Sequence, residues 1–560
     1  MKDLSLTYNT LPCFSVTGHI VDVVEKTIYD GTVWVEKGKI KSVDRHADVP
    51  EEAAYIMPGF IDAHVHTEST MVRPSEWAKA VVKLGTIAAA TDPHEIANVL
   101  GVDGIKYLLS DARKVNFHFL FGASPCVPCT PYETSGAVLD AEVVGQLLQL
   151  EQIGFISELM NAPAVIHHDA DTWKKIRAAQ AVGKPIDGHA PGLTGDDLKA
   201  YVAAGISTDH ECESVEEAIV KARLGMKILI REGSAARNFD ALKVLIRDIP
   251  EDCMLCIDDM NPHDLLQGEI NVLVQRAIAE GYDLWDVLRV ACVNPRDHYH
   301  FKSGLLQPGD GADFIMVDNL RSFQVRATFI NGQKVYDAQD ADVSPVIDHA
   351  KENHFPNRFE ALPISLDDIR LEAKSDRMKV IGAFDGQLYT STEYATPRVV
   401  DGHVVSDTEQ DVLKVIAYNR YRPGAQPVVA FMKGFGLKHA AMASSVAHDS
   451  HNLIAIGTSD ALIVEAMNRL IEMQGGQLII SDCGTTEVSL PIAGLMSSLS
   501  VEQLAPQLLS LRKAAQSAGC SFQDPFMTLA FMALPVISTI KLSDQGLFDV
   551  DAFAFTHLFE

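Results

Sequence analysis

Apolar and polar residues alternate along the start of the chain in short segments separated by glycine turns. The segments have the two-residue period of half-buried strands, with turns at Asp30-Gly31 and Lys37-Gly38: residues 18–24, 31–35 and 39–43. A similar pattern returns far downstream, at residues 313–317 and 327–332. The simplest interpretation is one small composite β-sandwich built from residues 1–57 and 303–345, with a large insertion between its two parts.

The insertion, residues 58–302, alternates apolar strand-like runs with helical stretches. The predicted strands end at eight positions: His64/His66, Asp92, Ser124, Glu158, His189, His210, Arg231 and Asp258. Alternating strands and helices favour a parallel sheet. Eight strands in about 245 residues is the size of a (β/α)8 barrel. We therefore predict an α/β protein in which a TIM-type barrel is inserted into the small β domain.

A polar stretch around residues 341–362, with Pro345 and Pro356, marks a linker. The rest of the chain contains strands, glycine-rich turns and two amphipathic helices, near residues 461–473 and 501–515. We predict a separate C-terminal α+β domain over residues 346–560.

Net charge and composition argue against some classes of binding partner. A formal net charge of -28 argues against a nucleic-acid partner, because such proteins concentrate Lys and Arg. No apolar run reaches the roughly 18 residues that span a bilayer. The first residues, Met1 to Ser5, lack a basic start followed by an apolar stretch, and nine cysteines are few. These features predict a cytoplasmic protein without a membrane partner.

The ends of the predicted strands carry metal-binding side chains. His64 and His66 are one residue apart in a strand, so both imidazoles lie on the same face. Further candidates follow the later apolar runs and should project into the same barrel mouth: Glu158, His189, His210 and Asp258. Four imidazoles and two carboxylates suffice for two divalent ions, with one carboxylate bridging. The same alternation predicts that Asp259 points away from Asp258.

Longer motifs carry a family resemblance. Residues 58–66, Pro-Gly-Phe-Ile-Asp-Ala-His-Val-His, are similar to the signature of the amidohydrolase superfamily, and residues 306–313 resemble its return into the small sheet. Several segments resemble the branch of that superfamily that deaminates adenine: 91–99, 157–161, 187–192, 230–238, 253–259, 443–452 and 468–476. The resemblance covers nearly the whole chain. One departure is Ile257, where we expect Thr in close relatives.

The resemblance implies hydrolytic deamination of adenine to hypoxanthine and ammonia by a metal-bridged hydroxide, since divalent metals lower the pKa of water from 15.7 to about 7. It assigns His64, His66 and Asp258 to one ion and His189 and His210 to the other, with Glu158 bridging. Asp258 also accepts the proton of the attacking water. We expect two Mn²⁺ ions, with Fe²⁺ or Zn²⁺ as alternatives, a small nucleobase substrate and a homo-oligomer, a dimer.

Some roles stay open at this point. Glu95 is our candidate for protonating the ring N1, but Glu158 could do so instead, leaving Glu95 or His94 as a ligand. Arg231, Ser234 and His94 are candidate substrate contacts, and ordinary loop hydrogen bonding explains Arg231 and Ser234 equally well. A second polar cluster, His448, Asp449 and His451, either closes the pocket or caps a helix.

Two alternative functions are kept beside this one. The nearer is another amidohydrolase that acts on a different nucleobase or a cyclic amide, which the general signature fits equally well. The more remote is a catalytically silent binding protein on the same scaffold, a class that loses ligands.

Overall fold

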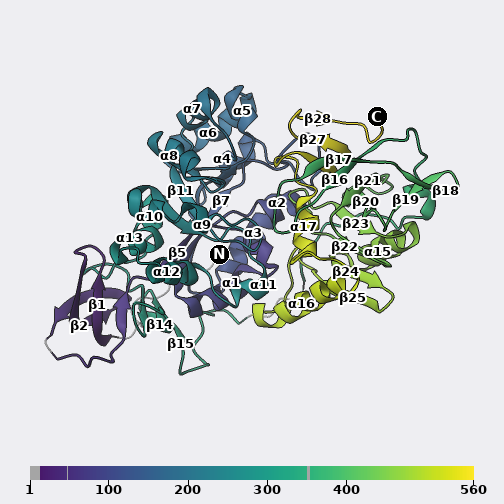
Figure 1. Ribbon diagram of the computed structural model, residues 1–560. Coiled ribbons are helices and arrows are strands. Elements are labelled where there is room, and N and C mark those ends of the chain that lie inside the picture. The colour runs from purple at the N-terminus through teal and green to yellow at the C-terminus, as the bar shows by residue number, and fades with distance from the viewer. Residues whose placement is uncertain (1–12, 47, 350–353) are drawn as a thin grey trace.

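The computed structural model describes residues 13–46, 48–349 and 354–560. Figure 1 shows a small sheet at one end, a region of parallel strands and helices in the middle, and a larger sheet at the other end. Residues 1–5, which carry the expectation about a leader, and residues 350–353 of the expected linker lie outside the described residues.

Strands from both sides of the insertion form one seven-stranded sheet in the order β15-β14-β13-β4-β1-β2-β3. Their bounds are β1 Phe14–Asp22, β2 Thr27–Glu36, β3 Lys39–Arg45, β4 Tyr55–Met57, β13 Phe314–Val317, β14 Val325–Ile330 and β15 Gln333–Asp337. Strand β4 pairs with β1 and with β13, which confirms that one composite sheet joins the two segments. The two-layered sandwich stays a prediction, because these strands are hydrogen bonded as a single sheet.

Eight parallel strands follow in two sheets, β5 to β9 and β10 to β12. Their bounds are β5 Phe60–Val65, β6 Thr86–Thr91, β7 His118–Ala123, β8 Ile153–Leu159, β9 Ile186–Gly188, β10 Thr208–Asp209, β11 Lys227–Arg231 and β12 Cys253–Cys256. The Ser207 N–H donates to the Ile186 carbonyl (2.9 Å) and the Asp258 N–H to the His64 carbonyl (2.9 Å), which links the sheets at both edges. The parallel sheet is therefore curled, as in a TIM-type domain.

The strands end within two residues of the positions that the hydrophobic pattern predicts. Apolar side chains of these strands pack together in a buried cluster, among them Ala63, Ala90, Phe155, Leu229 and Met254. This packed layer is a core rather than a pore.

Helices connect the strands. The longer ones are α1 Pro74–Val81, α3 Val102–Ala112, α6 Ala170–Val182, α7 Gly195–Ala203, α8 Val215–Arg223 and α12 Ile270–Ala279, and the shorter ones are α2 His94–Leu100, α4 Ala141–Leu147, α5 Ala162–Ile166, α9 Phe239–Leu242, α10 Leu245–Asp248, α11 Pro262–Leu265, α13 Leu284–Leu288 and α14 Asn294–Tyr299. Local sequence sets several starts: Asp169 and Ser214 accept backbone N–H groups at the beginnings of α6 and α8.

The C-terminal part is built on an eight-stranded mixed sheet in the order β17-β16-β21-β20-β23-β22-β24-β25. Its strands are β16 Met378–Gly382, β17 Ser391–Ala395, β20 Leu413–Tyr418, β21 Val428–Lys433, β22 Ala440–Ser444, β23 Leu453–Gly457, β24 Gly476–Ser481 and β25 Gly484–Ser489. Shorter strands form two further small sheets, β18-β19 and β26-β27-β28: β18 Arg398–Val400, β19 His403–Val405, β26 Ile540–Ser543, β27 Gly546–Asp549 and β28 Ala554–Phe555.

Both expected C-terminal helices are confirmed, as α15 Asp460–Met473 and α16 Val501–Ser517. Ser459 and Ser500 cap their first turns, and the apolar stripe of α15 packs on the sheet. A third helix, α17 Pro525–Phe531, lies between the sheet and the parallel strands (Figure 1).

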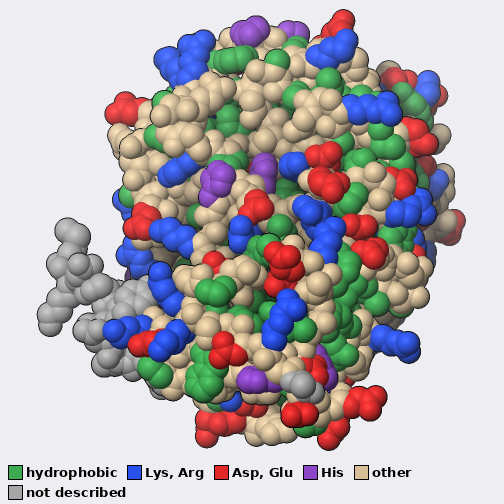
Figure 2. Space-filling model, turned by 90° about the vertical axis from the view of Figure 1, so that its left-hand side faces the viewer, with side chains coloured by type: hydrophobic (Ala, Val, Ile, Leu, Met, Phe, Trp, Pro, Cys, Tyr) green, Lys and Arg blue, Asp and Glu red, His purple; other side chains and the backbone are tan. Residues whose placement is uncertain are grey.

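Acidic and basic side chains are interspersed on the face that Figure 2 shows. Among the described residues, no helix combines the length and the apolar character needed to cross a bilayer.

Candidate metal centre and substrate pocket

His64 on β5, His66 directly after it and Asp258 after β12 meet at the mouth of the curled sheet. His64 Nε2 and His66 Nε2 lie 3.2 Å apart, and each faces Asp258 Oδ1, at 3.4 Å and 3.2 Å. Strand alternation explains the shared face of the two imidazoles. Asp62 ties β5 to the chain that follows β12, because its Oδ1 accepts the N–H groups of His64 (3.1 Å) and Ile257 (3.2 Å).

Glu158 lies at the centre of the cluster. Its Oε1 faces His66 Nε2 at 3.4 Å, while its Oε2 lies 2.8 Å from His189 Nδ1 and 3.4 Å from His210 Nε2. Burial by itself would raise the pKa of Glu158, but hydrogen bonds with His189, His210 and His66 hold that pKa well below its usual range. One carboxylate thus contacts the histidines of both expected ligand sets.

The donor set fits divalent cations. Several groups of nitrogen and oxygen atoms have ligand atoms within 4.8 Å of one another, among them three fully buried groups that contain the expected ligands: His64, His210 and Asp258; Glu158, His189 and His210; and His66, Asp92, His94 and Glu158. The buried His189 Nε2 has no hydrogen-bond partner in the structure. Buried polar atoms normally have a partner, which a bound divalent ion would supply here. Imidazole and carboxylate ligands suit Zn²⁺, Fe²⁺ and Mn²⁺.

Asp258 divides its two oxygens between different partners. Oδ1 faces the histidines, and Oδ2 accepts a hydrogen bond from Arg231 Nη1. The same guanidinium binds Glu211 in a bidentate pair, at 2.7 Å and 2.8 Å. Burial opposes ionisation of Asp258, but Arg231 and the two histidines keep its pKa well below the usual range. The expected substrate contact at Arg231 is therefore also the group that holds Asp258.

The expectation for Asp259 is wrong. Its side chain lines the same pocket as Asp258 and can share ligand positions with His66. The strand ends at Cys256 and Asp258 has a positive φ of 62°, so the alternation of strand faces does not continue to Asp259. Burial raises the pKa of Asp259 to about 6.

Glu95 is held by the C-terminal part of the chain. Its Oε1 lies 2.6 Å from His448 Nδ1, and its Oε2 bonds to His451 Nε2. Burial opposes ionisation of Glu95, but His448, His451 and His94 lower its pKa well below the usual range. Of the two interpretations of the second polar cluster, the structure supports the one in which it closes the pocket.

The main chain sets the tautomer of His451. The Ala447 N–H donates to His451 Nδ1 at 3.2 Å, so the ring proton lies on Nε2 and is donated to Glu95. A metal ligand would need its lone pair at that Nε2. The arrangement therefore fits a hydrogen-bonded carboxylate better than a third cation bound by His451.

His94 lies among three buried carboxylates. Its Nδ1 is 3.1 Å from Asp92 and 3.5 Å from Glu158, and its Nε2 is 3.5 Å from Glu95. Asp92 also accepts the N–H groups of His94 (3.0 Å) and Glu158 (3.3 Å), which ties the ends of β6 and β8 together. His94 is thus placed to contact either a metal ion or a substrate.

A buried chamber lies over these groups. Its barrel side is the cluster just described, and its opposite wall comes from the C-terminal part: Leu388, His448, Asp449, Phe531, Leu534 and Ile537. The Phe531 ring stacks on His448, with centroids 4.2 Å apart and planes at 7°. A flat, largely apolar wall facing polar groups suits a planar aromatic substrate.

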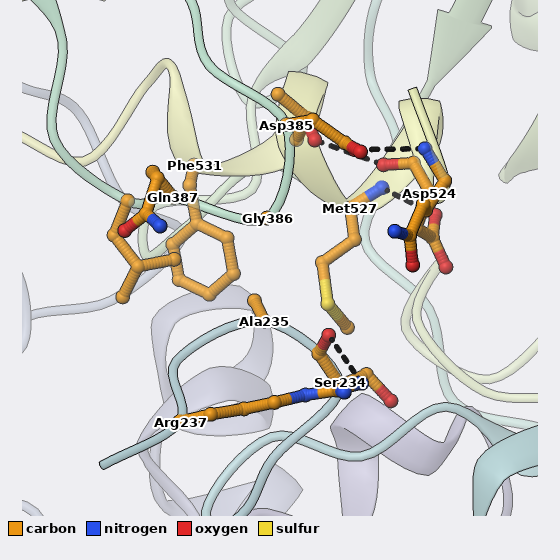
Figure 3. A pocket seen from close by; sticks show the side chains of 12 residues that line it. Ser234, Ala235, Arg237, Asp385, Gly386, Gln387, Asp524, Met527 and Phe531 are labelled. Atoms are coloured by element: carbon orange, nitrogen blue, oxygen red, sulfur yellow. Dashed lines mark hydrogen bonds between the residues drawn. The ribbon is translucent and has the colours of Figure 1, made fainter. Parts of the chain in front are cut away.

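Ser234 is the one expected site residue that the structure does not bring to the cluster. It accepts the Asn261 N–H (2.8 Å), donates to Asp264 Oδ2 (2.5 Å) and lines a separate outer cavity. Figure 3 shows Ser234, Ala235 and Arg237 on one side of that cavity, facing Phe531, Met527 and Gln387.

Sequence reasoning missed the role of Glu211 and the apolar wall. Glu211 directly follows His210, so a carboxylate next to a strand-end ligand was a signal that could have been used. Leu388, Leu534 and Ile537 have no such signal, because apolar residues in loops are common on any chain.

Comparison with known proteins agrees with this geometry. A profile described as the amidohydrolase family matches residues 55–335, and one described as the adenine deaminase C-terminal domain matches residues 387–554. The curled sheet with its histidine and carboxylate cluster thus belongs to a metal-dependent hydrolase of the amidohydrolase superfamily.

Relatives that align over nearly the full length of the chain show which family of the superfamily it belongs to. An adenine deaminase of Salinibacter ruber is 47% identical over 98% of this chain and 99% of its own length, and one of Methanosarcina barkeri is 46% identical over 97% and 98%. The chain belongs to the adenine deaminase family. A solved β-aspartyl dipeptidase of Fervidobacterium islandicum is 14% identical, with a TM-score of 0.44 over 60% of this chain and 98% of its own.

Proposed function

We propose that the protein hydrolyses adenine to hypoxanthine and ammonia. The observation that carries the proposal is the buried Glu158, in contact with histidines from three strand ends, beneath a chamber closed by the family's own C-terminal region. Ammonia release from a panel of purines and pyrimidines by the Mn²⁺-loaded protein tests it. Release only from cytosine or guanine would favour the alternative of another nucleobase deaminase.

We propose that His64, His66 and Asp258 would hold one divalent ion and His189 and His210 the other, with Glu158 in contact with histidines of both sets. Bound divalent metal supplies Lewis acidity and lowers the pKa of water towards neutrality. The chain supplies the remaining chemistry: it positions the ring, excludes bulk water and moves protons.

Proton transfer falls to two carboxylates. Asp258 is ionised, oriented by Arg231 and close to His64 and His66, so its oxygen can accept the proton of the attacking water and return it to the leaving nitrogen. We assign the delivery of the proton to ring N1 to Glu95, which lines the chamber beside His448. Glu95 raises the pKa of His448 to about 9 against the effect of burial, so the protonated His448 can supply that proton through the carboxylate that it is bonded to.

Adenine is expected to be preferred over adenosine by at least about a hundredfold in kcat/KM. A ribose on N9 adds several heavy atoms to a ring that must fit under the wall of the chamber, and a single methylene is worth about 10–200-fold in such pockets. Steady-state kinetics with both compounds measures the ratio. Comparable values for the two substrates would contradict the proposal.

Replacing His451 should lower kcat more than it changes KM. His451→Phe leaves Glu95 without one buried donor, which costs about 1–3 kcal/mol, or about 5- to 150-fold in kcat when the loss is felt in the transition state. His451→Gln keeps an N–H donor and should recover part of the loss. Equal impairment of both variants, with equal thermal stability, would show that donation to Glu95 is not what matters.

Other features remain predictions: manganese as the native metal, a homodimer, a cytoplasmic location, and domain boundaries at residues 57/58, 302/303 and 345/346. We also propose that the eight parallel strands form a closed (β/α)8 barrel, which the hydrogen bonds at both sheet edges support.

A further inference from the structure

One residue of the C-terminal part separates the buried chamber from two cavities nearer the surface. Leu388 lines the chamber, the outer cavity of Figure 3, and a side cavity bordered by Glu213 and Tyr389. Among the residues that the structure describes, no other lines all three of these cavities. Leu388 is half-buried, whereas its neighbours Gln387 and Tyr389 are exposed, so its side chain is the one that this loop turns inward.

A lysine side chain links Leu388 to Phe531 by hydrogen bonds. The fully buried Lys541 on β26 donates to the carbonyl of Leu388 (2.6 Å) and to that of Phe531 (3.0 Å). Phe531 lines both the chamber and the outer cavity. A buried amino group is costly to leave without hydrogen-bond partners, so these two bonds fix the loop and the end of α17 relative to each other.

The positions of C6 and N9 in the purine ring indicate which part of the substrate faces Leu388. Carbon C6 must lie at the metal cluster, and N9 is at the far end of the fused ring, so the N9 edge points away from the cluster. The wall of the chamber opposite the cluster contains Leu388 and Phe531, with further space behind Leu388.

We propose that Leu388 and Phe531, held together by Lys541, are the specificity determinants that reject purines substituted at N9. The inference rests on the proposed deamination of adenine. Removing the Leu388 side chain would join the chamber to the space behind it and provide room for an N9 substituent.

The test compares 9-methyladenine with adenine as substrates of the metal-loaded protein. The ratio of their kcat/KM values should rise at least about tenfold in Leu388→Ala, since one methylene in an apolar pocket is worth about 10–200-fold. Lys541→Met should raise the ratio in the same direction. Met527→Ala is the matched control, because Met527 lines the outer cavity but not the chamber, and its ratio should stay within about twofold of the parent.

An unchanged ratio in a folded Leu388→Ala protein overturns the inference, as does an equal rise in Met527→Ala. If Leu388→Ala does not fold, Leu388→Val is judged by the same ratio, which should rise in the same direction, since even one lost methylene is worth about 10–200-fold in an apolar pocket. A parent protein that does not deaminate adenine refutes the proposed function instead. Calorimetry then still measures the affinities for adenine and 9-methyladenine, and so tests whether Leu388 and Phe531 reject an N9 substituent.

Discussion

Asp258→Asn is expected to reduce kcat by about 10⁴-fold while much of the bound metal is retained. The amide keeps the shape and one ligating oxygen, and the remaining candidate ligands are untouched: His64, His66, Glu158, His189 and His210. What disappears is the group that takes the proton of the attacking water and returns it to the leaving nitrogen, two steps for which acid–base assistance contributes about 10²–10⁴-fold each. Steady-state kinetics and metal analysis of the purified variant measure both quantities.

Asp259 cannot serve as the control for this variant, because it lines the same pocket. Asp252 precedes the opposite end of β12 and forms a half-exposed ion pair with Lys227 at 2.8 Å. Such pairs contribute about 0–1 kcal/mol, so Asp252→Asn should keep its activity within about twofold. A fully active Asp258→Asn, or an Asp252→Asn variant equally impaired, would remove Asp258 from its proposed role.

His66→Ala is expected to lower the metal content from two ions per chain to one or fewer and to reduce deamination at least about a thousandfold. Metal ions contribute several kcal/mol of transition-state stabilisation, and each 1.36 kcal/mol is a tenfold change in rate. His66 is the histidine that faces both Asp258 and Glu158, so its loss disturbs both ion positions. Elemental analysis gives the metal content independently of the assay.

Thermal unfolding provides a second readout. An ion at a hundred times its Kd stabilises the folded protein by about 2.7 kcal/mol per site, so Mn²⁺ should raise the Tm of the parent more than that of His66→Ala. The exposed His46 supplies the control substitution, and His46→Ala should behave as the parent does. Two ions retained with full activity in His66→Ala would refute the ligand assignment.

Local pattern was sufficient for most of the barrel side of the site. The two-residue period of β5 placed His64 and His66 on one face, and the apolar runs of β8 and β12 placed Glu158 and Asp258 at the mouth. The pattern failed two residues beyond β12. Asp259 lies in the pocket because the positive φ of Asp258 turns the chain there, and strand alternation cannot anticipate such a turn.

The sequence by itself determined the class of fold, the composite sheet and the strand-end residues gathered here, since periodicity and strand ends are local properties. Only the tertiary structure decided which partners those residues have. Glu95 meets His448 and His451 across more than 350 positions, and Lys541 joins Leu388 to Phe531. Such contacts depend on how the C-terminal part packs over the mouth of the curled sheet, and no local pattern records that packing, because any apolar or polar face is compatible with many partners.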